Sequence, residues 1–191
     1  MSKKAIVIMF SSATVIMVAL VAGWWFWQSR SVKLTSFSNN LGVSFNYPQK
    51  LDVQPLSEQD NKDKFLFRAL QPQGILSLLI TLRYEEGLKR VISLSKQEPI
   101  DLLVNNTKLA YPKRFPGYKE ISQRMFDIKG HKAAEFIFTY QNKGETVKQQ
   151  FLIIIKDDDT AFYLAFQSKE SDFDKVSNKY FTLIINSLDV K

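Results

Sequence analysis

The chain contains no cysteine, and this absence excludes several kinds of site. Without thiols the protein forms no disulfide bond, offers no thiolate nucleophile and binds no zinc ion through cysteine. An N-terminal cysteine that carries a lipid anchor is excluded as well. The absence of cysteine leaves the redox compartment open.

Histidine, glycine and proline are also scarce. The 191 residues include one histidine, 7 glycines and 6 prolines, while 45% are hydrophobic. This composition predicts a largely folded chain with room for one sizeable domain and an anchor. The single histidine, His131, follows a Lys-Gly turn, where we expect a solvated side chain, and no nucleophile-elbow pattern accompanies it. These shortages disfavour a hydrolytic or metal-dependent enzyme, and we expect a non-catalytic protein.

Charged residues are missing from one long stretch, residues 5–27. About 20 apolar residues span a bilayer as a helix, and Trp24, Trp25 and Trp27 at the end of the stretch suit the headgroup layer. We therefore predict a cytoplasmic tail over 1–4, a transmembrane helix over 5–27, a polar tether over 28–40 and an extracytoplasmic domain over 41–191. The protein would then be a single-pass protein of the cell or thylakoid membrane. The alternative is a cleavable signal peptide with its cleavage site at residues 21–23.

Four strands are predicted between Tyr118 and Ser168, joined by three tight turns. The turns are Lys129-Gly130, Asn142-Lys143-Gly144 and Asp157-Asp158-Asp159. The third strand, Val147 to Lys156, is apolar on both faces in its second half. A strand of this kind lies in the interior of a sheet, with other elements packed above and below it.

The remaining segments predict further strands and two helices. Alternating residues 43–47 form a half-buried strand that ends at Pro48, residues 57–64 form a charged loop, and residues 65–70 and 75–84 form a hairpin. In the second hairpin strand the more polar face carries Ser77, Thr81 and Arg83. We expect residues 85–98 to be irregular, a helix to begin at Pro99 and end before Tyr111, and a long amphipathic helix to span 171–188.

The final helix has two sequence signals. Ser171 and Asp174 fit a capping box at its start. Residues at helical spacing predict one buried face, and they are Phe173, Val176, Tyr180, Ile184 and Leu188. Strands and helices do not alternate along the chain. This order indicates an α+β fold, in which helices flank an antiparallel sheet.

Three segments resemble the PsbP-like family, which includes the extrinsic PsbP protein of photosystem II and related bacterial extracytoplasmic domains. They are Gly42-Val43-Ser44-Phe45-Asn46-Tyr47-Pro48, the Gly130-to-Tyr140 strand with Ala134-Glu135-Phe136, and Phe181-Thr182-Leu183-Ile184-Ile185-Asn186-Ser187. The similarity covers roughly residues 36–190. It implies an α-β-α sandwich and a non-catalytic role in the assembly or stability of a membrane complex. The sequence departs from the family where a Trp often follows the Tyr-Pro pair, because Leu51 and Val53 occupy that region here.

The best candidate for partner contact is the segment from Tyr111 to Tyr118, which is rich in aromatic and basic residues. Aromatic and arginine side chains are enriched at the energetic centres of interfaces. We expect protein partners or anionic headgroups to contact five of its residues: Tyr111, Lys113, Arg114, Phe115 and Tyr118. The net charge is +7, but residues 31–191 hold 23 basic and 19 acidic residues, a mild excess of +4 that suits anionic surfaces, and no motif indicates nucleic acid.

The only metal candidates are Asp157, Asp158 and Asp159, which could attract Ca²⁺ or Mn²⁺. Successive side chains diverge, however, and the run lacks the spaced ligands of a calcium loop, so we expect a hairpin turn and no cofactor. The predicted function is that of a membrane-anchored, non-catalytic domain that binds or stabilises a membrane protein complex, which in a photosynthetic source would be photosystem II. The alternative is an extracytoplasmic domain that binds a small ligand or a metal.

Overall fold

The computed structural model describes residues 32–71, 78–157 and 159–191, and residues Leu34–Lys191 form one compact unit. The predicted tail and membrane helix, residues 1–27, lie outside the described residues. Within the described part of the chain, every helix is too short or too polar to cross a membrane.

The described residues build a seven-stranded antiparallel sheet in the order β3-β4-β5-β9-β8-β7-β6. These strands are β3 (Asp52–Val53), β4 (Phe65–Leu70), β5 (Leu79–Glu86), β6 (Lys119–Ile128), β7 (His131–Asn142), β8 (Glu145–Ile155) and β9 (Thr160–Lys169). The predicted four-strand meander is confirmed as β6 to β9. Its first two turns carry positive φ angles at Lys129, Gly130, Lys143 and Gly144.

Strand β8 is buried on both faces, as its apolar run predicts. Residues 151–155 are all at most 9% exposed. Phe151, Ile153 and Ile155 belong to the hydrophobic cluster on one face of the sheet, and Leu152 and Ile154 belong to the cluster on the other. The sheet is therefore the middle layer of a sandwich.

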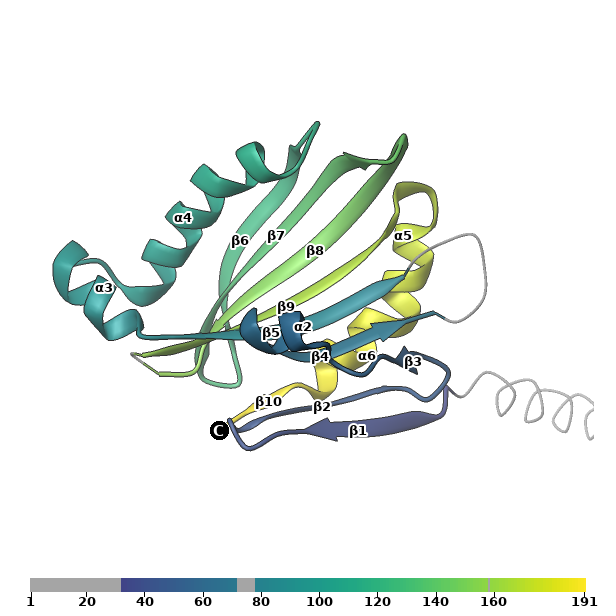
Figure 1. Cartoon of the computed structure of the whole chain (residues 1–191), viewed down its shortest axis with the longest axis horizontal. Helices are drawn as coiled ribbons and strands as arrows, with labels where there is room; N and C mark the ends of the chain where they lie inside the picture. The colour runs from purple at the N-terminus through teal and green to yellow at the C-terminus, as the bar shows by residue number, and fades with distance from the viewer. Residues whose placement is uncertain (1–31, 72–77, 158) are drawn as a thin grey trace, which may run out of the picture. The chain divides into compact units, whose positions relative to one another are not determined.

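Helices α3 (Leu88–Ser95) and α4 (Pro99–Arg114) cover one face (Figure 1). Two predictions were wrong here, because residues 85–98 contain α3 and α4 continues past Tyr111 to Arg114. Helix α3 is bounded by left-handed residues at Gly87 and Lys96, which obscure it in the sequence. Helix α4 continues because Tyr111 extends its buried stripe, and that packing offsets the cost of Pro112 in the last turn.

The predicted C-terminal helix covers the other face (Figure 1). It consists of α5 (Glu170–Val176), the π-helical η1 (Ser177–Phe181) and α6 (Thr182–Ser187). The predicted capping box is wrong, because Ser171 lies inside the helix and Lys169 is the N-cap. The wider π turn shifts the helical phase, so that both Tyr180 and Phe181 are buried. The stripe is otherwise confirmed: Phe173, Ile184 and Leu188 are buried and Val176 is partly buried.

A second, three-stranded sheet joins the same cluster, in the order β1-β2-β10. Its strands are β1 (Leu34–Ser38), β2 (Val43–Pro48) and β10 (Asp189–Val190). Residues 34–38 are thus a strand where we expected a tether, because Phe37 packs its ring 5.0 Å from that of Phe45 and 5.1 Å from that of Phe67. The predicted charged loop contains the short helix α2 (Glu58–Lys62), which a capping box between Ser57 and Asp60 begins.

Candidate functional site

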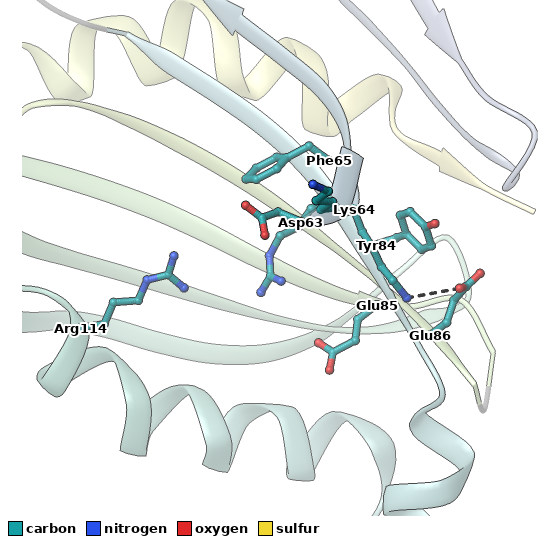
Figure 2. Close-up of a pocket in the computed structure, with 9 residues that line it drawn as sticks. Asp63, Lys64, Phe65, Tyr84, Glu85, Glu86 and Arg114 are labelled. Atoms are coloured by element: carbon teal, nitrogen blue, oxygen red, sulfur yellow. Dashed lines mark hydrogen bonds and ion pairs between the residues drawn. The ribbon is translucent and has the colours of Figure 1, made fainter. Parts of the chain in front are cut away.

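A pocket lies beside α4, over the part of the sheet that this helix leaves open. Helix α4 packs on β7 and β8, whereas β5 lies beyond β9 in the sheet. On β5, Ile80 and Leu82 belong to the cluster on the opposite face, so the alternating residues Arg83 and Glu85 point to the α4 side. The pocket has a volume of about 480 Å³ and is shown in Figure 2.

The pocket is lined mainly by charged side chains. Its lining comprises four basic residues, three acidic residues and two aromatic residues: Lys62, Lys64, Arg83, Arg114, Asp63, Glu85, Glu86, Phe65 and Tyr84. A smaller hollow of about 190 Å³ shares Arg83, Glu85 and Arg114 with it. The smaller hollow is otherwise more apolar, since Leu103, Ala110, Tyr111, Phe151 and Tyr163 line it.

Arg83 is positioned by an aromatic stack that runs across the sheet. Its guanidinium carbon lies 4.3 Å from the ring centroid of Tyr163, its register partner on β9. The Tyr163 ring stacks on Phe151 at 5.8 Å, and Phe151 lies 5.2 Å from the ring of Tyr111 on α4. Because Tyr111, Phe151 and Tyr163 are buried, the stack gives Arg83 a rigid base.

Glu85 is engaged by the same tyrosine. The Tyr163 hydroxyl donates a hydrogen bond of 2.5 Å to Glu85 Oε2. Burial raises the pKa of Tyr163 well above its usual value, and the hydrogen bond and negative charge of Glu85 raise this pKa further. Tyr163 therefore remains a protonated donor at neutral pH, and part of the acceptor capacity of Glu85 is already used.

The other acidic side chains of the pocket also have partners. Lys64 Nζ lies 3.4 Å from Glu86 Oε2, as the dashed line in Figure 2 marks, and Gln59 donates to both carboxylate oxygens of Asp63 at 3.1 Å. The two arginines differ. Within residues 32–71, 78–157 and 159–191, the guanidinium groups of Arg83 and Arg114 form no hydrogen bond or ion pair.

The structure divides the predicted partner-binding segment into two parts. Tyr111 is buried in the core, and Phe115 and Tyr118 are partly buried against the same cluster. The Phe115 ring lies 4.7 Å from that of Tyr140, and the Tyr118 hydroxyl donates to Glu120 at 3.2 Å. The basic residues Lys113 and Arg114 are exposed in the last turn of α4. Figure 2 shows Arg114 extending from this end of α4 over the sheet.

Sequence reasoning missed the contribution of β5 to this site. The predicted polar face of β5 contains Arg83, but nothing in a single sequence places that face opposite the end of α4. The structure brings Arg83 and Arg114 to the same two hollows. Helical spacing offered one usable signal, because continuing the stripe from Thr107 to Tyr111 extends α4 as far as Arg114.

In the described part of the β8–β9 turn, the aspartate side chains accept hydrogen bonds from backbone N–H groups. Asp157 Oδ1 accepts hydrogen bonds from the backbone N–H groups of Asp159 and Thr160, at 2.9 and 2.8 Å. Burial alone would raise the pKa of Asp157, but these hydrogen bonds outweigh it and lower the pKa. Asp159 Oδ1 accepts from the N–H of Lys89. Asp158 lies outside the described residues, and no group of potential metal ligands occurs in the part of the chain that the structure describes.

His131 is held between the two sheets instead of being solvated as we expected. Its Nδ1 lies 3.1 Å from the carbonyl oxygen of Ile155, and its Nε2 lies 3.0 Å from that of Val190. The ring therefore links the end of β8 to β10. Both ring nitrogens lie against backbone carbonyl oxygens, so this histidine has a structural role in joining the two strands.

Solved structures show that the fold is PsbP-like. The cyanobacterial PsbP protein (CyanoP) of Synechocystis sp. PCC 6803 aligns over 84% of this chain and 94% of its own, with a TM-score of 0.57 and 10% identity. LpqN of Mycobacterium tuberculosis, described as involved in cell envelope biogenesis, aligns over 86% of this chain and 94% of its own, with a TM-score of 0.51 and 12% identity. No protein-family model and no curated protein matches the sequence. At these identities the likeness is one of fold.

Proposed function

We propose that this chain is a membrane-anchored, non-catalytic domain that binds and stabilises other membrane-associated proteins on the extracytoplasmic side. Residues 5–27 would provide the anchor, and in a photosynthetic cell the stabilised complex would be photosystem II. The PsbP-like fold is consistent with this role, since CyanoP is a form of PsbP and LpqN is involved in cell envelope biogenesis. The function itself has to come from the site.

The observation that carries the proposal is the pair of arginines, Arg83 and Arg114, that line one pocket without acidic partners among the described residues. An unpaired guanidinium offers five N–H donors in a planar fork, which suits an acidic group on a partner. Arginine is also enriched among the residues that contribute most to binding.

The smaller hollow has a rigid aromatic wall, and rigidity favours binding. Tyr111, Phe151 and Tyr163 are buried, and they fix the strand and the helix from which the two arginines project. Little backbone freedom is therefore lost when a partner docks. Lys113 and Arg114 in the last turn of α4 also interact favourably with the helix dipole.

The polar groups of the pocket suit binding better than catalysis. The described lining residues of both hollows include no histidine, serine or cysteine. A serine or cysteine nucleophile beside a histidine base is a common arrangement for covalent catalysis, and the described lining of both hollows lacks it. The charged side chains instead form a polar surface, and a partner that docks there would displace the water molecules bound to it.

Recovery of partners from native membranes tests the proposal. The full chain, carrying an affinity tag, is crosslinked in membranes of its source and purified. We expect the chain to remain with the membranes after a carbonate wash, and specific proteins to be recovered with it. Arg114→Glu should reduce this recovery, because it places a negative charge in the pocket.

A matched control separates the pocket from general charge. Lys108→Glu also replaces a basic residue with an acidic one, but Lys108 is an exposed residue of α4 that lines neither hollow. We expect this variant to recover partners like the natural chain. Failure to recover any specific protein would contradict the proposal, and so would an equal loss in both variants.

A further inference from the structure

The pocket beside α4 has more hydrogen-bond donors than acceptors available to a ligand. The carboxylates of Asp63, Glu85 and Glu86 already accept from Gln59, Tyr163 and Lys64. The guanidinium groups of Arg83 and Arg114 donate to nothing among the described residues, and both arginines line both hollows. A ligand that completes the pocket must therefore bring acceptors, and a charged acceptor forms the stronger hydrogen bonds.

The charge of the lining favours a ligand with a single negative charge. Four basic side chains face three acidic ones, and Glu85 lies in the region that the two hollows share. A carboxylate carries one negative charge, whereas a phosphate group carries nearly two at neutral pH. The second charge would meet the repulsion of Glu85, so the lining favours the carboxylate.

The smaller hollow indicates what lies next to the charged group. Leu103, Ala110 and Tyr111 from α4 and Phe151 and Tyr163 from the sheet form the apolar and aromatic part of its lining, and Asn106 and Thr107 of α4 also line it. Its volume is about 190 Å³. This space suits one small apolar side chain, and burying that side chain adds affinity without adding charge.

We propose that this pocket binds a peptide carboxylate between Arg83 and Arg114, with a neighbouring apolar side chain of the same peptide in the smaller hollow. The inference rests on the proposed function, because a protein partner would supply the peptide. The carboxylate comes either from the C-terminus of the partner or from an acidic side chain. Both sources present the same planar group, which can accept two parallel N–H bonds from an arginine.

Synthetic peptides can distinguish the two sources. The full chain in neutral-detergent micelles is titrated calorimetrically with acetyl-Gly-Ser-Gly-Val bearing a free C-terminal carboxylate, with its C-terminally amidated form, and with amidated acetyl-Gly-Ser-Val-Glu. Binding of the first peptide alone identifies a C-terminal carboxylate. Binding of the third peptide, with the amidated second peptide inactive, identifies an acidic side chain. Equal binding of all three overturns the inference, because the charged group would then be irrelevant.

Variants assign the binding to the arginines. Arg114→Gln should weaken binding of the active peptide about tenfold or more, because it removes charge-assisted hydrogen bonds. Arg83→Gln should do the same, and Arg83→Lys, which keeps the charge, serves if the loss of the stack on Tyr163 prevents folding of the glutamine variant. Lys108→Gln removes an exposed charge on the same helix outside the pocket and should leave binding unchanged.

Glu85→Gln gives an effect of the opposite sign. The amide oxygen can still accept from the Tyr163 hydroxyl, while the negative charge disappears, so affinity for the peptide should rise about two- to fivefold. An unchanged affinity in Arg114→Gln would overturn the inference. Binding of inorganic phosphate tenfold tighter than the peptide would overturn the choice of a carboxylate.

The proposed function and this inference can fail separately. If crosslinking recovers partners but no carboxylate peptide binds at millimolar concentration, the pocket assignment is wrong and the binding role stands. If the peptide binds and Arg114→Gln abolishes binding, but membranes yield no partner, the pocket assignment stands and the proposed role fails.

Discussion

Replacing Gly42 with alanine should show how much the packing of the C-terminus against β2 contributes to the stability of the domain. Gly42 has a φ angle of +87°, and a Cβ atom added there would lie 2.6 Å from the backbone carbonyl oxygen of Lys191. The N–H of Lys191 donates to the carbonyl of Gly42 at 2.9 Å. The substitution therefore forces the end of the chain away from β2, where β10 pairs through only Asp189 and Val190.

The expected magnitude follows from comparison with Gly144. Gly144 lies in the β7–β8 turn with a φ angle of +82°, and a Cβ atom there would meet nothing within 4 Å. Gly144→Ala carries only the backbone cost, which is about 1–2 kcal/mol for an L-residue in the left-handed region. Gly42→Ala carries that cost together with the clash, and the two hydrogen-bonded segments must separate. We expect the free energy of unfolding to fall by about 1–2 kcal/mol more than in Gly144→Ala.

Thermal unfolding of the full chain in neutral detergent, followed by far-ultraviolet circular dichroism, measures the difference. A loss of 1 kcal/mol lowers the Tm of a protein of this size by about 2–4 °C. The loss of about 1–2 kcal/mol in Gly144→Ala therefore corresponds to about 2–8 °C, and we expect Gly42→Ala to lower the Tm about twice as much. Equal shifts in the two variants would refute the close approach of Lys191 to Gly42.

Further predictions concern the core and the buried tyrosines. Ile184 is fully buried beneath the sheet, and Ile184→Ala should lower the free energy of unfolding by about 2–5 kcal/mol; an unchanged urea midpoint would show that α6 does not pack there. Burial, followed by the charge of Glu120, raises the pKa of Tyr118 to about 12, and burial also raises that of Tyr163. Because both pKa values are higher in the folded state, stability should be fully present below pH 10 and decline as the pH rises toward 12. Urea unfolding as a function of pH measures this decline, and a loss of stability that is complete below pH 9 would contradict the assignment.

The sequence predicts the meander well because local rules govern it. Gly130 and Gly144 occupy turns that need positive φ angles, and alternation or continuous apolarity marks each strand between them. The same reasoning identifies β8 as an interior strand. Its hydrogen-bond partners are the neighbouring strands β7 and β9, which follow from short connections.

Predictions failed where tertiary contacts override local signals. Helix α3 is short and lacks a side-chain cap, and both of its ends are left-handed, so residues 85–98 looked irregular. The helix from Pro99 was predicted to end before Tyr111, but the packing of Tyr111 against Phe138 and Phe151 keeps α4 helical to Arg114. The π turn at 177–181 shifts the helical phase, and a regular period of 3.6 residues therefore did not identify Phe181 as buried.

The candidate site was predictable only in part. The aromatic and basic composition of residues 111–118 predicts a contact surface, which stays a prediction, and of these residues Arg114 lines the pocket. The role of Arg83 depends on the strand order β5-β9-β8. Helix α4 packs on β8, and β5 lies two strands away from β8. Long-range strand order of this kind leaves no local signal, and the pairing of β10 with β2 is unpredictable for the same reason.

Site-specific photo-crosslinking in native membranes tests the central claim most directly. A photoreactive amino acid replaces Lys62, an exposed residue of the pocket lining, or Leu109, a residue of α4 that is 68% exposed and lies outside both hollows. We predict a specific crosslinked protein from position 62 that disappears when Arg114→Gln is added, and none from position 109. No crosslink from position 62, or one that persists without Arg114, would contradict a partner-binding role for the pocket.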